Sequence, residues 1–331
     1  MKQRGLQWTA SRLAPFAGTV CLLLCLAFSG SVSAADRVHF LIPGGAGGGW
    51  DSTARGVGEA LARSGLVEVA SYENLSGGGG SRAMAHLIET ADRQTNTLMI
   101  SSSPIILRSL RNLYPQSYRD LTPVASVVVD YGAFVVRVDS PYESWQDVID
   151  DFSANPRGVN IAGGSSRASM DHIVAALAFQ KSGVDARQMK YIPYNAGGHA
   201  MVGLLSGETQ LLSTGLSEAI ALADQGEVRI LAMTAPDRLE RVPDVPTLVE
   251  QGVPAVFSNW RGFFAAPGAS AAQIQQFRAT LSALFETDAW RTIRELRGWT
   301  DFHVTGDAFD TFLDQQEQDM AVLLRELGLL E

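Results

Sequence analysis

The chain has little cysteine and little lysine. Its two cysteines, Cys21 and Cys25, lie inside a short apolar run near the N-terminus, and only Lys181 and Lys190 follow that run. The rest of the chain therefore has no disulfide, no thiol nucleophile and no thiolate metal site. A formal net charge of −9 with so few lysines is also unlike the basic footprint of a nucleic-acid-binding protein. We expect no nucleic-acid partner.

The first 35 residues have the composition of a cleavable signal peptide. Three basic residues precede the apolar stretch 16–28, and small residues at 31–35 suit a signal peptidase. A lipoprotein anchor is the alternative, but Leu24 stands before Cys25 where that motif has a small residue. The stretch is shorter than the roughly 20 residues of a membrane helix, and no later stretch reaches that length. We expect a soluble periplasmic protein with a charge of −12, because residues 1–35 carry three basic and no acidic residues.

One structural unit recurs after the leader: a short β-branched segment, a turn rich in glycine or serine, and an amphipathic helix. Strands are expected at 37–43, 66–74, 96–100, 157–163, 189–194, 209–215 and 228–234. Helices are expected at 51–65, 81–90, 170–183, 199–208 and 216–227. This alternation predicts an α/β fold of mostly parallel sheets flanked by helices, in which ligands bind outside the carboxyl ends of the strands.

Two interruptions of the pattern predict two lobes. Residues 131–141 have no glycine-rich turn and are typical of a strand that passes between two halves. Residues 236–270 are rich in proline and irregular, and 271–331 is expected to be helical and to return to the first half. The predicted boundaries are 36–134 plus 257–331 for lobe 1, and 135–256 for lobe 2.

Nucleotide and catalytic signatures are missing. The glycine-rich loop at 44–51 has Trp50 where a dinucleotide-binding fingerprint needs its third glycine, and it has no Lys-Ser/Thr of a P-loop. Ser165 comes closest to a nucleophile elbow, but Arg167 stands in the place of the closing glycine. The five histidines show no metal-ligand spacing. We expect no cofactor, no metal and no catalysis; a secreted α/β hydrolase that uses Ser165 is the enzymatic alternative.

The remaining hypothesis is that the glycine-rich turns bind an anion through their backbone N–H groups. Free N–H groups and the helix dipole make a helix N-terminus a site for a carboxylate, and serine hydroxyls add neutral donors. At least four such turns from both halves could converge on one cleft, which favours a small ligand with several carboxylates. For any single turn, tight packing with serine as an N-cap is the alternative. Arg82 and Arg167 follow two of the turns, and Asp51 either caps a helix or faces the cleft.

Six stretches occur in an order that is typical of one family: 43–55, 73–80, 163–172, 191–198, 238–252 and 259–268. Together they resemble the extracytoplasmic substrate-binding receptors of tripartite tricarboxylate transporters, including the Bordetella-type uptake receptors. The resemblance implies a two-lobed, type II periplasmic-binding fold with a ligand cleft between the lobes. It further implies delivery of a citrate-like di- or tricarboxylate to integral-membrane permease subunits, and we expect a monomer. A sensor that presents the ligand to a signalling membrane protein is an alternative that the sequence leaves open.

The resemblance also implies which residues bind the carboxylates. Carried over by motif position, they are Gly47, Gly48, Asp51, Asn74, Gly77, Gly79, Gly80, Gly164, Ser165, Ser169, Tyr194, Asn195 and Gly198. The turns themselves add Gly49, Ser101, Ser102 and Ser166 as further ligand-binding candidates. One departure from the family lies at 73–77, where many members have proline before the glycine, so this wall of the cleft is expected to differ.

Overall fold

The computed structural model describes residues 35–330, so the predicted signal peptide lies outside the described residues apart from Ala35. Ten strands and ten α-helices are present in this part of the chain. The strands are β1 Ala35–Ile42, β2 Val67–Asn74, β3 Thr97–Ser102, β4 Thr122–Arg137, β5 Asn160–Gly163, β6 Lys190–Pro193, β7 Leu211–Gly215, β8 Val228–Met233, β9 Ser258–Ala265 and β10 Thr300–Asp301. The helices are α1 Gly49–Arg63, α2 Ser81–Glu89, α3 Ser103–Leu110, α4 Trp145–Ala154, α5 Met170–Lys181, α6 Gly197–Leu205, α7 Leu216–Asp224, α8 Ala271–Leu284, α9 Asp288–Arg297 and α10 Asp307–Glu326. No helix among residues 35–330 has the length and apolar character needed to cross a membrane.

The strands form one mixed sheet in the order β2-β1-β3-β9-β4-β7-β5-β6, with β8 and β10 paired to β4. The outer strands are parallel: β1 pairs with β2 and β3, and β5 pairs with β6 and β7. The central strands β4 and β9 are antiparallel to each other and to their remaining neighbours. The parallel strands belong to strand–turn–helix units, so the turns that precede α1, α5 and α6 all begin at carboxyl ends of strands.

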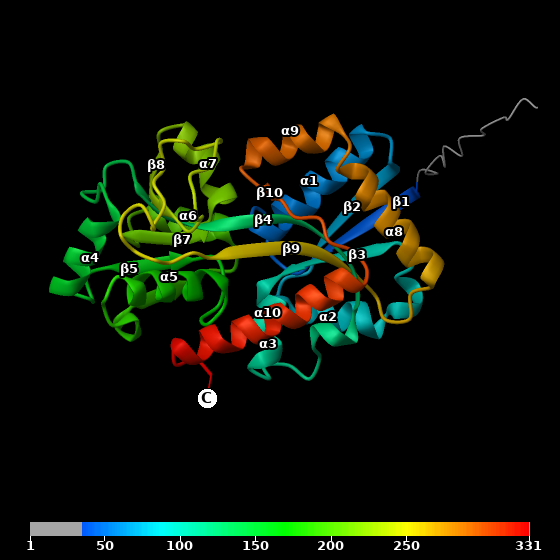
Figure 1. Ribbon diagram of the computed structural model, residues 1–331, viewed down its shortest axis with the longest axis horizontal. Helices are drawn as coiled ribbons and strands as arrows, with labels where there is room; N and C mark the ends of the chain where they lie inside the picture. Colours follow the sequence, from blue (N-terminus) through cyan, green and yellow to red (C-terminus); the bar gives the residue numbers. More distant parts are fainter. Residues whose placement is uncertain (1–34, 331) are drawn as a thin grey trace, which may run out of the picture. The chain divides into compact units, whose positions relative to one another are not determined.

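Strand β4 joins two lobes (Figure 1). Its first part, up to Tyr131, pairs with β9, and its last part, from Gly132, pairs with β7 and β8. We call the part with β1–β3, β9 and β10 lobe 1 and the part with β5–β8 lobe 2. The change of pairing partner falls within three residues of the predicted boundary at 134/135, and the boundaries themselves stay a prediction.

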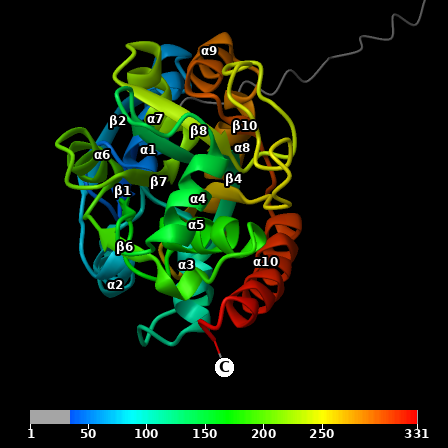
Figure 2. The same ribbon diagram turned by 90° about the vertical axis from the view of Figure 1, so that its left-hand side faces the viewer.

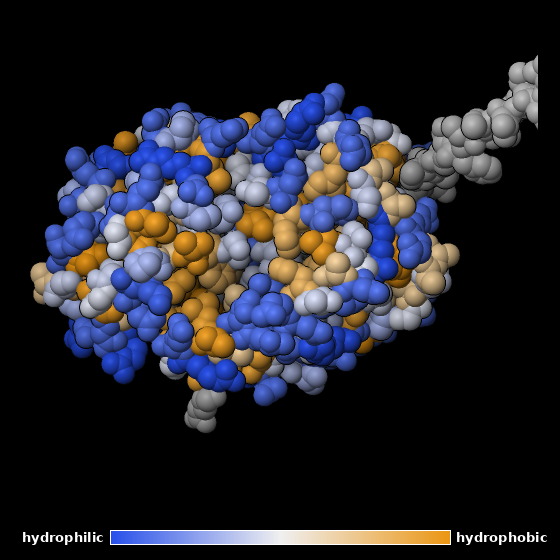
Figure 3. Space-filling model, in the orientation of Figure 1, coloured by the Kyte–Doolittle hydropathy of each residue, from blue (hydrophilic) through white to orange (hydrophobic). Residues whose placement is uncertain are grey.

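Helices cover both faces of the sheet in each lobe. Helix α1 packs on β2 and α9 in lobe 1, and α10 runs beside α3, as both views show (Figures 1 and 2). The buried side chains form three clusters: one in lobe 1 that includes Phe40 and Phe263, one in lobe 2 that includes Leu212, and a larger one that includes Trp260 of lobe 1 and Trp145 of lobe 2. Strand β3 is buried at every position, as expected for a strand with helices on both sides. Hydrophilic residues cover most of the rim of the face in Figure 3, and hydrophobic ones gather toward its middle.

The order of the predicted units is confirmed, but two strands differ from the expectation. The strand expected at 131–141 is β4, which begins nine residues earlier at Thr122. The region expected to be irregular, 236–270, contains β9. Both are central strands that are buried on two faces, so they lack the alternation of apolar and polar residues by which half-buried strands are identified.

Candidate functional site

A cavity of about 400 Å³ lies between the lobes, at the carboxyl ends of the parallel strands. The turns after β1, β2 and β3 form one wall, and the turns after β5, β6 and β7 form the opposite wall. Strands β4 and β9 close the cavity with Asp130, Tyr131, Asn259 and Arg261. The two walls approach each other closely: Gly45 of lobe 1 lies against Ala196 and Asn195 of lobe 2.

The first glycine-rich loop is held by Asp51, which is 5 % exposed. Its carboxylate accepts hydrogen bonds from the Gly47 backbone N–H (3.0 Å), from Arg55 Nε (2.8 Å) and from Asn74 Nδ2 (3.0 Å). None of these four residues lines the cavity, whereas the neighbouring Gly48 and Gly49 do. Asp51 therefore shapes the loop from behind, and three protein groups occupy its carboxylate in this structure.

Arg108, on α3, places a guanidinium at the junction of the second and third loops. Its Nη1 donates to the Gly78 carbonyl (3.1 Å) and to the Tyr114 hydroxyl (2.5 Å), and its Nη2 donates to the Ser166 hydroxyl (2.8 Å) across the cleft. All three partners are neutral, and no ion pair involves Arg108 in the described part of the chain. Burial lowers the pKa of Arg108, and its Nε is buried without a hydrogen-bond partner among residues 35–330. Within residues 35–330, this positive charge therefore has no counter-ion.

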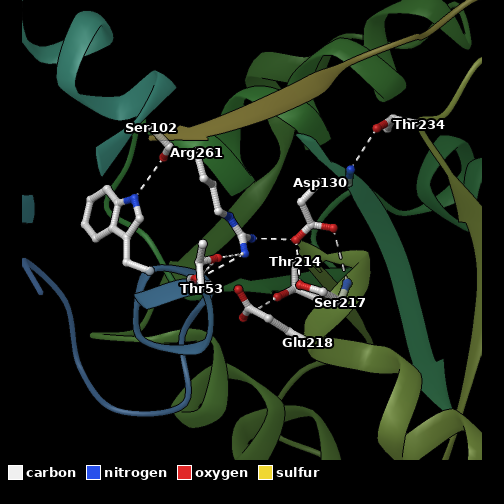
Figure 4. Close-up of polar contacts among 11 residues, drawn as sticks. Thr53, Ser102, Asp130, Thr214, Ser217, Glu218, Thr234 and Arg261 are labelled. Carbon is white, nitrogen blue, oxygen red and sulfur yellow. Dashed lines mark hydrogen bonds and ion pairs between the residues drawn. The ribbon is translucent and has the colours of Figure 1, made fainter. Parts of the chain in front are cut away.

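The second guanidinium of the cavity, Arg261 on β9, is already paired. Its Nη2 contacts the Asp130 carboxylate at 2.5 Å, and its Nη1 donates to the Gly49 carbonyl (3.0 Å) and to Thr53 Oγ1 (2.8 Å). Asp130 also accepts from the backbone N–H and the hydroxyl of Ser217, at the start of α7 (Figure 4). Arg261 and Asp130 are 2 % and 1 % exposed, so their charges compensate each other in a dry environment. This network connects the first loop of lobe 1 to α7 of lobe 2.

Two further carboxyl groups line the cavity beside this pair. Glu218, on α7, accepts a hydrogen bond from Thr214 Oγ1 (3.0 Å), and Asp171 lies in the first turn of α5. Burial and the negative charge of Asp171 raise the pKa of Glu218 to about 8, although the opposing charge of Arg261 lowers it. Burial likewise raises the pKa of Asp171 to about 6, against hydrogen bonds from Ser165 and Gly164 that lower it. At neutral pH, Glu218 is therefore mostly protonated and Asp171 mostly ionised.

The predicted ligand-binding residues fall into two groups. Eleven line the cavity: Gly48, Gly49, Gly77, Gly79, Ser102, Gly164, Ser165, Ser166, Ser169, Tyr194 and Asn195. Six lie outside the cavity wall: Gly47, Asp51, Asn74, Gly80, Ser101 and Gly198. Ser101 alternates with Ser102 along β3, so the two side chains point to opposite faces of the sheet. Direct contact of the first group with a ligand stays a prediction.

The two arginines that follow the glycine turns in the sequence do not line the cavity. Arg82 donates to the Ser76 carbonyl (3.5 Å), and Arg167 donates to the Tyr191 carbonyl (2.9 Å). The nearby His172 uses Nδ1 to accept a hydrogen bond from the Ala168 backbone N–H (3.2 Å), and the carboxyl group that contacts the Ser165 hydroxyl belongs to Asp171. The Ser165 hydroxyl accepts from the Asp171 backbone N–H (3.1 Å), in the first turn of α5. Among the described residues, no group of three or more His, Cys, Asp or Glu has the geometry of a metal site.

Sequence reasoning missed the charged residues of the cavity, namely Arg108, Asp130, Asp171, Glu218 and Arg261. A signal existed for two of them. Asp130 is an isolated acid in the apolar run of β4, and Arg261 interrupts the apolar part of β9. A lone charge in a buried strand is costly, and such residues are paired or functional. Arg108 and Glu218 lie on amphipathic helices, where a charge is unremarkable.

Comparison with known proteins gives one consistent result. The model of the tripartite tricarboxylate transporter family receptor matches residues 53–329. The protein BugT of Bordetella pertussis is 26 % identical over 298 residues, which cover 89 % of this chain and 90 % of BugT.

Solved structures have the same fold. The periplasmic binding protein BugD superposes with a TM-score of 0.81 at 20 % identity, covering 90 % of this chain and 99 % of BugD. An R. palustris protein solved with adipate has a TM-score of 0.80 at 21 % identity, covering 88 % of this chain and 97 % of that protein. The fold is thus the two-lobed fold of periplasmic binding proteins, with the cavity between the lobes.

Proposed function

This chain belongs to the tripartite tricarboxylate transporter receptor family, and from that membership we propose that it captures a small organic carboxylate between its lobes and delivers it to the membrane permease of such a transporter. The family consists of periplasmic solute-binding receptors and not of enzymes. Export through the predicted signal peptide fits this role. A role as a ligand sensor is the second possibility, and uptake measured in a deletion strain separates it from transport.

The observation that carries the proposal is the uncompensated charge of Arg108. A guanidinium binds a carboxylate strongly in a partly buried site, because such charge-assisted hydrogen bonds are about twice as strong as neutral ones. Gly79 and Ser166 lie directly beside the Arg108 guanidinium and bring a backbone amide and a hydroxyl to the same end of the cavity. A ligand carboxylate at this point would supply the missing negative charge.

The charges of the cavity also bear on how many carboxylates the ligand carries. The resemblance implies a citrate-like di- or tricarboxylate, which is the finer form of the proposal. Arg261 is already neutralised by Asp130, and the ionised carboxylate of Asp171 opposes further negative charge. The cavity therefore favours a ligand with fewer carboxylates than citrate.

A thermal-shift panel of mono-, di- and tricarboxylates on the mature protein tests the proposal. Ligand at one hundred times its Kd adds about 2.7 kcal/mol to the free energy of unfolding, which raises Tm by several degrees. Arg108→Gln is expected to weaken binding of every carboxylate by about tenfold or more. Arg82→Gln is the matched control, because Arg82 lies in the adjacent loop but outside the cavity. The proposal is wrong if no carboxylate raises Tm, or if both variants bind as the wild type does.

A further inference from the structure

The charged groups of the cavity are divided between two ends. Arg108, without a counter-ion, lies where the second and third loops meet. Glu218 and Asp171 lie beside β4 and β9, next to the neutralised pair of Arg261 and Asp130. The charges that act on Glu218 are Asp171, Arg261 and Asp130, whereas those that act on Arg108 are Tyr114 and Arg111. The cavity thus has one end that needs an anion and another that needs a hydrogen-bond donor.

We propose that the ligand is an amphoteric carboxylate, with a carboxylate for Arg108 and a protonated nitrogen for Glu218 and Asp171. This inference rests on the proposed function and names its ligand class. A dicarboxylate of the same length would place its second negative charge beside the ionised Asp171 and would keep Glu218 protonated, and within residues 35–330 no unpaired cation lines this end of the cavity. An ammonium group would replace that repulsion with attraction and donate hydrogen bonds.

The position of Glu218 fits a ligand-binding role. Its Oε1 lies 2.8 Å from the point where a Cβ on Gly49 would stand, and its Oε2 occupies the space of a Cβ on Gly197. Gly49 belongs to lobe 1 and Gly197 to lobe 2, so the carboxyl group is inserted between the two walls of the cleft. Only Thr214 donates a side-chain hydrogen bond to it within residues 35–330, which leaves acceptor capacity for a ligand.

Another acceptor, which has no donor among residues 35–330, lies on the same side of the cavity. The Oδ1 atom of Asn259 is buried and has no hydrogen-bond partner in the described part of the chain. Asn259 stands opposite Asp130 in the pairing of β9 with β4, and both residues line the cavity. A ligand nitrogen with several N–H donors would satisfy such acceptors, whereas a carboxylate has none to offer.

The groups that face Glu218 determine how binding depends on pH. They are Asp171 from α5, Arg261 from β9, Asp130 from β4 and the Thr214 hydroxyl from β7. Because burial and Asp171 raise the pKa of Glu218 to about 8, an ammonium group must displace a proton from Glu218 at pH 7. Binding of an amino carboxylate should therefore release close to one proton and strengthen by up to about tenfold per pH unit toward pH 8. Binding of a dicarboxylate should weaken over the same range.

The test uses carboxylates that share a three-methylene chain and differ only at the other end. These are pentanoate, 4-hydroxybutanoate, 4-aminobutanoate and glutarate, measured by titration calorimetry on the mature protein at pH 7 in two buffers of different ionisation enthalpy. Series with one and two methylenes cover shorter ligands. The amino member is expected to bind at least about tenfold more tightly than the methyl and carboxylate members. The difference between the buffers reports the released proton.

The Glu218→Gln variant tests whether Glu218 is the group that binds the protonated nitrogen and releases the proton. The variant should lose the amino preference by about tenfold or more, lose the proton release and bind glutarate better. Glu227→Gln, at an exposed residue three positions after the end of α7, is the control. Asp171→Asn is the second variant in case Glu218→Gln fails to fold. If carboxylates bind through Arg108 but glutarate exceeds 4-aminobutanoate, this inference is overturned while the proposed function stands. If no member of any series binds, both are overturned.

Discussion

Glu218 makes the stability of the ligand-free protein depend on pH, and replacing it by glutamine should remove that dependence. Its pKa rises from 4.5 in the unfolded chain to about 8 in the folded protein. Between these values the folded protein holds a proton that the unfolded chain has lost. The free energy of unfolding therefore falls by about 1.4 kcal/mol per pH unit as the pH rises through this interval.

Two neighbours titrate over part of the same interval. The pKa of Asp171 rises from 3.8 to about 6, so it also lowers stability with rising pH, but only below about pH 6. Burial and nearby arginines lower the pKa of His172 from 6.5 to about 4, so His172 raises stability with rising pH below 6.5. Of these three groups, only Glu218 titrates between pH 6.5 and 8.

The expected effect follows from that window. Over 1.5 pH units, Glu218→Gln should gain at most about 2 kcal/mol of stability relative to the wild type. Water in the cavity screens part of this, because Glu218 is half-buried and not sealed from solvent. For a chain of this size the gain corresponds to an increase of about 4 °C in the difference between the Tm values of variant and wild type.

The assay is thermal unfolding of the ligand-free mature protein at pH 6.5, 7.5 and 8.5, with Glu227→Gln as the control. The Tm difference between Glu218→Gln and the wild type should grow with pH, and that of the control should not. A difference that stays constant across the three pH values would refute the reasoning, because it would mean that Glu218 ionises at the same pH in both states.

Two substitutions test how the loops are built. Gly79→Ala should weaken carboxylate binding by about tenfold or more, because φ of Gly79 is +62° and the new Cβ would collide with the guanidinium of Arg108. Gly47→Ala is the control: φ of Gly47 is +77° and nothing lies within 4 Å of the new Cβ, so the substitution should cost only about 1 kcal/mol of stability. Equal losses of affinity for the two variants in titration calorimetry would contradict this. Asp51→Ala should lower the free energy of unfolding by about 1–3 kcal/mol in chemical denaturation, because it leaves the donors of Gly47 and Asn74 without the Asp51 carboxylate, and ligand affinity should fall with it. A loss of affinity at unchanged stability would instead indicate direct ligand contact.

The lobes and most of the turns could be predicted because they depend on local patterns. A β-branched run followed by glycine and an amphipathic helix identifies its own element, and the order of such units predicts the sheet. Strand β9 escaped prediction because it is buried along most of its length and has no alternation. Its pairing with β3 and β4 joins segments more than a hundred residues apart, and no local pattern records such a contact.

The same distinction applies to the site. Eleven predicted residues line the cavity, since they belong to turns that the fold brings together. Arg108 and Glu218 depend instead on where long side chains reach from ordinary helices. Arg82 and Arg167 stand closer to the glycine turns in sequence, yet backbone carbonyls take their guanidinium groups. Proximity in sequence predicted the backbone of the cavity but not its charges.

These charges change the meaning of the glycine-rich loops. A Cβ on Gly49 would meet Arg261 and Glu218, one on Gly197 would meet Glu218, and one on Gly79 would meet Arg108. Glycine at these three positions therefore makes room for charged side chains of the protein as well as for a ligand. Backbone N–H groups can bind any carboxylate, because every carboxylate accepts their hydrogen bonds equally well. The selectivity of the cavity must then come from the charged side chains that the missing Cβ atoms admit, and the loops and the charges act as one unit in choosing the ligand.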